Sequence, residues 1–303
     1  MLKKIKYIIN KKLFFYTLDK YKTTMFFTQA KKYNAHLDFC KKKNKNLKIK
    51  ISNSSKEFIK KGYSCFKTKN SMEIANSILK KIKKDEKNNK NFWDKDGRFS
   101  QEDILNKFPE LVNLFEKDLK NFFKAIYETN FSIFYGLLYK STNLGEMPKG
   151  SQLWHLDGGP GTCINLMYCI SDVTKKNGSM KCLTWEDSKK IIKELYSEYY
   201  KLDDQLKNNK INKDIHRISK SKLLKLKISE LNNNKINQPE SKPGLIYAFR
   251  NNCIHSGGYP QKNKSRYVFV FHIYPSTKNI NFSQITKLGI QKKSPFPSNP
   301  FEI

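Results

Sequence analysis

A change in hydrophobic periodicity near residue 130 limits most strongly what this chain can fold into. Before that point apolar residues recur at helical spacing, as in Ile74, Ile78 and Ile82. After it, short apolar or alternating runs typical of strands follow one another. These runs are FSIFYGLLYK (131–140), SQLWHLD (151–157), TCINLMYCISDV (162–173), SMKCLTW (179–185), GLIYAF (244–249), CIHSG (253–257) and RYVFVFHIY (266–274). Helices followed by a series of short strands predict a mainly β, α+β fold in which helices pack outside a jelly-roll barrel.

The same signals predict how the chain is divided. Residues 1–50 are rich in Lys and Asn with short apolar clusters, and we expect one or two helices plus a linker there. Residues 51–275 are expected to form the main domain. A charged stretch with helical spacing, 186–242, interrupts the strands and is interpreted as a helical insert. The polar, Pro-rich residues 276–303 predict an irregular tail. Asn177-Gly178, between two strand candidates, predicts a β-hairpin turn.

The net charge of +32 invites a nucleic-acid-binding interpretation, but its make-up argues against one. Only four of the 59 basic residues are arginine. Surfaces selected to bind nucleic acid normally use arginine as well as lysine. We therefore expect most of the lysines to form a solvated surface, although an anionic substrate or surface as partner stays open. The alternative class is a basic nucleic-acid-associated or macromolecule-modifying jelly-roll protein.

The sequence also bears on the compartment. No apolar run approaches the roughly 18 residues of a membrane-spanning helix, so no span is expected. The start MLKKIKYIINKKLFFY superficially suggests a signal peptide, but Asn10, Lys11 and Lys12 interrupt its apolar run and no small-residue cleavage site follows. The six cysteines are scattered without a C-x-x-C pair. They favour buried thiols in a reducing compartment, and we expect a cytoplasmic protein.

One candidate metal site stands out among the strand segments. His155 and Asp157 lie two apart on an extended segment, so both side chains leave the same face. An imidazole and a carboxylate on one face supply two adjacent ligands to an octahedral metal. His255, on a later strand candidate, is the natural third ligand. Two histidines and one carboxylate leave open positions of the kind that an Fe(II) site needs to activate O2.

The spacing of this motif is a weak signal by itself, because the chain contains it twice. His36, Leu37 and Asp38 form the same H-L-D tripeptide as His155 to Asp157. The surroundings of His36 predict a helix, on which positions two apart point to different sides. We therefore expect the first tripeptide to be structural and the second to bind metal.

Arg266 is the sharpest signal in the sequence. It lies eleven residues after His255 and opens a predicted strand, in a chain that uses lysine almost everywhere else. A planar guanidinium can bind the far carboxylate of 2-oxoglutarate bidentately while the keto-acid end chelates iron. Asn165 and Tyr139, on flanking strands, are candidates to hydrogen-bond the carboxylates of 2-oxoglutarate; an equal alternative is that they only line the wall.

The segments GSQLWHLDGG, INLMYCISDVTKKNGSM and KPGLIYAFRNNCIHSGGYPQKNKSRYVF resemble the core of the phytanoyl-CoA hydroxylase family of 2-oxoglutarate oxygenases. EFIKKGYSCFK resembles that family's usual opening. The resemblance implies a double-stranded β-helix (a cupin-like jelly roll), Fe(II) held by His155, Asp157 and His255, and 2-oxoglutarate held by Arg266. It further implies an enzyme that hydroxylates a small-molecule substrate with O2, releasing succinate and CO2. Halogenation is disfavoured because halogenases lack the carboxylate.

The chain departs from the family pattern at the substrate rim. KCLTWEDSKK replaces the usual Pro-Gly-Ser-His stretch and leads into the insert, and Gly257 stands where serine is common. The insert is expected to be either a lid over the substrate or a solvated decoration. Its three tyrosines at helical spacing favour packing. Trp154 is expected to pack outside the barrel, opposite the metal ligands, and His272 is expected to be a hydrogen-bonded core residue.

Overall fold

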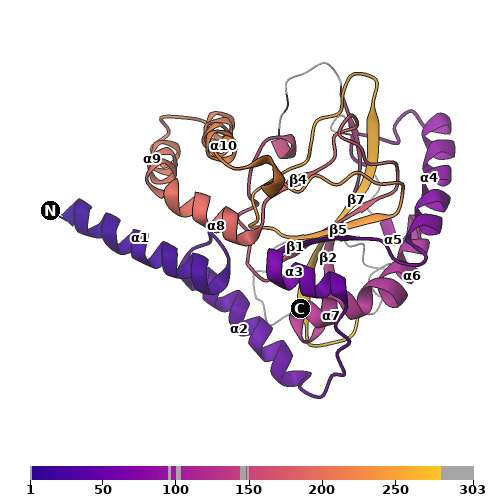
Figure 1. The fold of residues 1–303 in the computed structure, drawn as a ribbon, viewed down its shortest axis with the longest axis horizontal. Helices are drawn as coiled ribbons and strands as arrows, with labels where there is room; N and C mark the ends of the chain where they lie inside the picture. Colours follow the sequence, from indigo (N-terminus) through magenta and orange to yellow (C-terminus); the bar gives the residue numbers. More distant parts are fainter. Residues whose placement is uncertain (1, 95–96, 100–103, 144–147, 149, 281–303) are drawn as a thin grey trace.

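Helices surround a central pair of β-sheets in the computed structural model of this protein (Figure 1). The described residues are 2–94, 97–99, 104–143, 148 and 150–280. The helices are α1 (Leu2–Tyr21), α2 (Phe27–Lys43), α3 (Asn53–Lys61), α4 (Ser71–Asn88), α5 (Ile104–Lys107), α6 (Glu110–Asn113), α7 (Lys120–Tyr127), α8 (Trp185–Glu194), α9 (Tyr196–Lys207) and α10 (Lys213–Ser229). Short helical turns occur at η1 (Leu114–Leu119), η2 (Gly150–Gln152) and η3 (Asn233–Lys235). Among the described residues, no helix has the length and apolar composition that crossing a membrane requires.

The strands form two antiparallel sheets. They are β1 (Tyr63–Phe66), β2 (Asn130–Thr142), β3 (Ile164–Cys169), β4 (Lys181–Cys182), β5 (Leu245–Arg250), β6 (His255–Ser256) and β7 (Ser265–Ser276). The large sheet has the order β1-β5-β3-β7-β2, and the small sheet pairs β4 with β6. Single bridges widen the small sheet, joining His155 to His255 and Cys182 to Asn237. This architecture confirms the predicted α+β fold with a jelly-roll core.

Alternation along the strands explains why their sequences are almost continuously apolar. One face of the large sheet, including Leu166 of β3 and Phe269 of β7, packs against α3 to α7. The opposite face, including Met167 and Val268, points into the barrel and contacts α8. Because apolar groups cover both faces, neither strand needs a solvent-facing polar row. Polar side chains that point into the barrel are therefore unusual in these strands. Asn165 is one such side chain.

The N-terminal helices predicted for residues 1–50 are present and pack on the barrel. Helix α1 contacts α8, and α2 contacts β7. The connector between α1 and α2 is hydrogen-bonded to the loop that follows Asp157. The hydroxyl of Thr23 donates to the carbonyl of Gly159 at 2.6 Å, and the amide of Asn252 donates to the same carbonyl at 2.7 Å. The N-terminal segment is thereby joined to the backbone that carries a predicted metal ligand.

Gly161 is required where this connector crosses the loop. A Cβ atom added at Gly161 would lie 1.8 Å from the carbonyl oxygen of Tyr21, so the backbones must separate. Gly161→Ala is expected to displace the connector at a cost on the order of 2 kcal/mol and to speed tryptic cleavage after Lys22. The control is Gly150→Ala, because a Cβ there meets nothing within 4 Å and the strain of its φ of 58° lies away from the connector. Equal cleavage rates for the two variants would contradict the prediction.

The insert begins as predicted with helices, and its first helix is tied to the strand that carries His255. The side chain of Thr184 caps α8 by accepting from the backbone N–H of Asp187 at 3.1 Å. Further along α8, the hydroxyl of Ser188 accepts from the N–H of Ile254 at 2.9 Å. Ile254 directly precedes β6, so the insert helps to fix the backbone on which the third predicted ligand stands.

Several predicted strands are shorter than their sequence patterns suggest. Residues 151–157 form the end of a 3-10 turn and one bridge at His155 instead of a strand. Asn177-Gly178 lies in a turn, as predicted, but the strands on either side belong to different sheets, so it is not a hairpin. The small sheet is held largely by single bridges, which periodicity cannot reveal. Strand β7 extends to Ser276, and residues 281–303 of the predicted tail lie outside the described part of the chain.

The carboxylate of Glu86 anchors α4 to the strands that lead to Tyr139 and Arg266. Its donors, each at 3.0 Å, are Lys83, Trp93, Lys140 and Tyr267. Burial acts to raise the pKa of Glu86, but the four donors together lower it by more than burial raises it. The resulting pKa is about 2. Since the folded-state pKa lies below the ordinary value, the stabilisation is present above about pH 5 and is lost as pH falls toward 2.

Glu86→Gln is therefore expected to lower the free energy of unfolding by on the order of 2 kcal/mol at neutral pH. The difference in the free energy of unfolding between wild type and variant should shrink as the pH is lowered through the range in which Glu86 becomes protonated. Urea unfolding at several pH values measures both. Glu128→Gln is the matched control, because Glu128 makes an ion pair with Lys41 but 62% of its side chain is exposed. A difference that stays constant with pH would count against the ionised network.

Candidate metal centre

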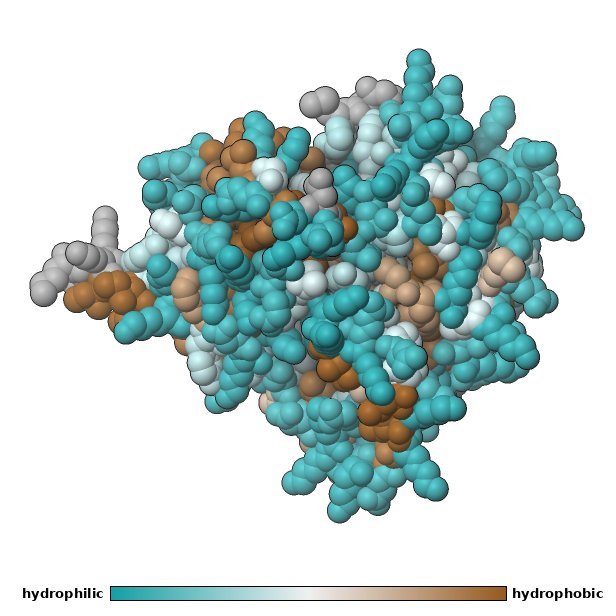
Figure 2. Space-filling model, viewed as in Figure 1, coloured by the Kyte–Doolittle hydropathy of each residue, from teal (hydrophilic) through white to brown (hydrophobic). Residues whose placement is uncertain are grey.

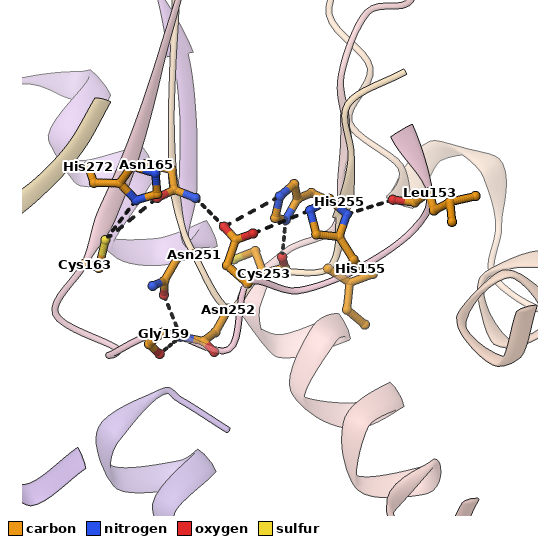
Figure 3. Close-up of polar contacts among 12 residues, drawn as sticks. Leu153, His155, Gly159, Cys163, Asn165, Asn251, Asn252, Cys253, His255 and His272 are labelled. Atoms are coloured by element: carbon orange, nitrogen blue, oxygen red, sulfur yellow. Dashed lines mark hydrogen bonds and ion pairs between the residues drawn. The ribbon is translucent and has the colours of Figure 1, made fainter. Parts of the chain in front are cut away.

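Three of the predicted site residues converge on one point between the two sheets. One ligand atom from each of His155, Asp157 and His255 lies within 4.8 Å of the others. Oδ1 of Asp157 is 3.5 Å from Nε2 of His155, and Oδ2 is 3.9 Å from Nε2 of His255. Figure 3 shows the imidazoles of His155 and His255 beside one another, and their ring centroids are 4.2 Å apart. Two nitrogens and one carboxylate on one side of a point form the facial arrangement that suits Fe(II) with open positions opposite.

Backbone hydrogen bonds set the tautomer of both histidines. Nδ1 of His155 lies 2.7 Å from the carbonyl oxygen of Leu153, and Nδ1 of His255 lies 2.8 Å from that of Cys253. A carbonyl oxygen only accepts, so each Nδ1 carries the proton and donates it. Each Nε2 is then left with its lone pair, directed toward Asp157. This is the arrangement that metal-binding histidines commonly have, with the second nitrogen held by a backbone acceptor.

The charges of the three side chains also suit a metal ion. Burial, with a smaller effect of His155, lowers the pKa of His255 to about 4, so this imidazole is neutral at neutral pH. Burial acts to raise the pKa of Asp157, but the attraction of the two imidazoles when they are protonated outweighs burial and lowers this pKa below the usual carboxyl range. A neutral imidazole and an ionised carboxylate are the forms that bind a divalent cation.

Asn165 lies beside the ligands and contacts Asp157 directly. Its Nδ2 donates to Oδ2 of Asp157 at 2.5 Å, which fixes the carboxylate from the side of the large sheet. Its register partner on β7 is His272, and both point to the same interior face. The pKa of His272 is lowered by burial, and its Nδ1 lies 3.8 Å from the sulfur of Cys163. The amide of Asn165 thus binds the carboxylate of Asp157, a contact that its strand position alone did not predict.

Arg266 lies in the same interior cavity, of about 460 Å³, as the three ligands. Its side chain is buried, with 3% of the residue exposed. The guanidinium donates to the backbone carbonyls of Gly178 and Gly257, while Nε has no hydrogen-bond partner. Among the described residues no carboxylate pairs with it, so the surface ion pair that would have been the ordinary explanation for Arg266 is absent. Tyr139 lines this cavity too.

A buried arginine without a carboxylate partner is costly unless an anion neutralises it. Desolvation lowers the pKa of Arg266, although arginine stays charged. The cavity leads from this guanidinium to the three ligands. The residues present therefore fit a metal ion together with a dicarboxylate-type anion that spans the distance between them.

A second, larger cavity of about 690 Å³ opens on the other side of the ligands. Its walls come from α1, the α1–α2 connector, α9 and α10, and His155 and Asp157 line its floor. Trp154 lines this cavity, so the prediction that it packs outside the barrel and away from the ligands was wrong. The alternation rule failed there because residues 151–157 are not a regular strand. The insert tyrosines Tyr196 and Tyr199 are buried, as packing predicts, and also line the cavity.

The first H-L-D tripeptide has the structural role expected of it. His36 lies on α2, buried, with Nε2 3.2 Å from the carbonyl oxygen of Pro275 and 3.5 Å from the sulfur of Cys40. Asp38 is exposed. A feature that sequence reasoning missed is Arg217 of α10, which borders both cavities. The scarcity of arginine, which singled out Arg266, applied to Arg217 as well.

Comparisons with known proteins agree with this geometry at the level of the fold. No family model and no curated protein sequence matches the chain. Among solved structures, EctD from S. alaskensis with 2-oxoglutarate and 5-hydroxyectoine has a TM-score of 0.50 and 12% identity, covering 83% of this chain and 89% of its own. EctD from the same source with bound Fe has a TM-score of 0.50 and 14% identity, with 75% and 80% covered. HygX from Streptomyces hygroscopicus, with nickel and 2-oxoglutarate bound, has a TM-score of 0.47 and 10% identity, covering 77% of this chain and 90% of its own.

This chain has the fold of EctD. At identities this low the similarity establishes the architecture and not the activity. It confirms the jelly-roll core predicted from the strand pattern, whereas the narrower resemblance to the phytanoyl-CoA hydroxylase family stays a prediction.

Proposed function

We propose that this protein is an Fe(II)- and 2-oxoglutarate-dependent oxygenase that hydroxylates a small organic substrate. The observation that carries the proposal is the convergence of His155, Asp157 and His255 on one point, in a cavity that also contains the buried, carboxylate-free guanidinium of Arg266. The fold similarity to EctD, solved with Fe in one structure and with 2-oxoglutarate in another, supports the choice of metal and cosubstrate.

When bound, Fe(II) with 2-oxoglutarate and O2 supplies the oxidation, which yields succinate, CO2 and a hydroxylated product. The chain's own residues hold and orient the reactants. The two imidazoles and the carboxylate of Asp157 would hold the metal through Nε2 and carboxylate oxygens. Arg266 would bind the far carboxylate of 2-oxoglutarate, and Asn165 would hold Asp157 in its orientation. Tyr139 is a candidate to hydrogen-bond the cosubstrate from the cavity wall.

Two further proposals follow from the sequence interpretation. The six cysteines are all free, and five of them are buried, which supports a reducing, cytoplasmic environment. The division into an N-terminal extension (1–50), an oxygenase domain (51–275) with an insert (186–242), and a tail (276–303) is also retained as a proposal. In this scheme both the extension and the insert contribute walls to the larger cavity.

Anaerobic titration of the wild-type protein with Fe(II) and 2-oxoglutarate tests the proposal. We expect an absorption band of the iron–keto-acid chelate, followed after admission of O2 by the formation of succinate. The competing interpretation, a basic nucleic-acid-associated protein, predicts instead strongly salt-dependent RNA or DNA binding that does not depend on iron. Failure to form the chelate band in folded protein would rule out the oxygenase.

A further inference from the structure

The distribution of arginine in this chain is strongly non-random in space. The protein has only four arginines among 59 basic residues. Three of them, Arg98, Arg217 and Arg266, line the cavities that meet at the metal ligands. The fourth, Arg250, is buried on β5 and donates to the carbonyl of Gly161 at 3.1 Å. Because lysine serves nearly every other basic position, the arginines stand where a planar, multiply donating cation is needed.

Arg217 is an exposed residue of α10 that borders both cavities. His216 and Lys220 both contact Oδ1 of Asp203, each at 2.7 Å, so Lys220 already offsets the charge of this carboxylate in the cavity wall. No hydrogen bond or ion pair joins Arg217 to any other residue in the described part of the chain. Its guanidinium therefore remains available to a ligand at the junction of the two cavities.

Aromatic side chains form one part of the wall of the larger cavity. Phe14 of α1 and Tyr196 of α9 have ring centroids 5.1 Å apart, and Tyr196 and Tyr200 have theirs 6.1 Å apart. With Trp154 they line a space that can receive a flat apolar group beside the metal ligands. Figure 2 shows one group of hydrophobic side chains over α10 and others elsewhere on a face that is otherwise largely hydrophilic.

We propose that the substrate of this enzyme has an apolar, ring-bearing body and an anionic carboxylate or phosphate group, and that Arg217 binds the anionic group. The aromatic walls would hold the body against the floor formed by His155 and Asp157, so that a carbon of the body faces the metal position. This inference rests on the proposed oxygenase function. It assigns the insert a part in selecting the substrate: α10 supplies the anion-binding residue and α9 supplies part of the apolar wall.

Matched small molecules test this inference without knowledge of the natural substrate. The probes are phenylacetate and 2-naphthylacetate, their neutral amides, and 2-naphthyl phosphate. Calorimetry with the full-length protein, with and without Fe(II) and 2-oxoglutarate under anaerobic conditions, gives the affinities. We expect at least one anion to bind about tenfold or more tightly than the matching neutral molecule. The phosphate and the carboxylates show which anionic group is preferred.

Three variants separate the contributions to binding. Arg217→Gln should reduce the affinity for the anionic probe to that for the amide and leave the amide unchanged. Lys222→Gln removes the same charge from an exposed position of the same helix, outside both cavities, and should preserve the preference. Tyr200→Ala should weaken acid and amide equally, because it shortens the apolar wall and leaves the guanidinium in place.

Several results would overturn the inference. These are a wild type that binds no member of the panel, an anion preference that survives Arg217→Gln, or an Arg217→Gln variant whose only defect is a higher requirement for 2-oxoglutarate. The last result would assign Arg217 to the cosubstrate. The chelate band recorded in the same samples distinguishes the two levels: its absence from wild type refutes the oxygenase, whereas its presence without anion preference refutes only the substrate class.

Discussion

Asp157→Ala is expected to weaken Fe(II) binding by more than about 100-fold and to abolish succinate formation. Loss of a residue that only hydrogen-bonds a metal ligand commonly lowers metal affinity by about 10- to 100-fold, and Asp157 would be a direct ligand. The carboxylate also contributes the negative charge that offsets the metal's positive charge between two neutral imidazoles. With only two nitrogens left, the iron would lack the third protein ligand that completes one face of the octahedron.

The chain supplies its own control for this experiment. Asp38→Ala makes the identical change in the other H-L-D tripeptide, where the aspartate is exposed on α2. It should leave Fe(II) affinity and turnover at wild-type levels. Metal content after dialysis and the anaerobic chelate band measure binding, and circular dichroism confirms folding. Wild-type iron affinity in Asp157→Ala would contradict the proposed ligand set.

Arg266→Gln is expected to raise the 2-oxoglutarate concentration needed for half-maximal chelate formation by about 100-fold, with little change in Fe(II) affinity. The buried guanidinium lacks a carboxylate partner among the described residues, so the cosubstrate would supply the missing charge. Lysine keeps the charge but cannot form two parallel hydrogen bonds. Arg266→Lys should therefore have an intermediate defect.

The separation of the two affinities decides between a binding role and a structural role for Arg266. Its side chain also donates to the carbonyls of Gly178 and Gly257, so some loss of stability is expected in both variants. Thermal unfolding without 2-oxoglutarate measures that loss. If Fe(II) and 2-oxoglutarate affinities fall together in a folded variant, Arg266 only supports the loops around the site.

The convergence of the three candidate metal ligands could be predicted because local spacing and residue scarcity pointed to the same chemistry. His155 and Asp157 share a direction even though their segment forms one bridge and not the predicted strand. His255 was placed beside them by the expected barrel, and the bridge between the two histidines confirms that neighbourhood. Scarcity of arginine identified Arg266, whose side chain proves to be buried in the same cavity.

What the sequence could not reveal depends on packing between distant segments. The contact of Asn165 with Asp157 requires β3 to lie across from a loop that has no periodic signal. The docking of Thr23 on Gly159 joins residues 136 positions apart. Trp154 was assigned to the wrong side because alternation was applied to an irregular segment. In each case the deciding interaction is between elements, whereas periodicity describes one element at a time.

The way the walls of the larger cavity are built has an evolutionary consequence. The barrel holds the residues that would carry out the oxidation. Helix α1 and the insert, which lie outside the barrel, form walls of the larger cavity in which a substrate would bind. Mutations in these two appendages can therefore change which compounds are accepted without touching a single ligand. Related proteins that share the barrel can therefore differ in substrate and keep the same reaction. Grafting the N-terminal helix and the insert together onto a related barrel should transfer the substrate preference.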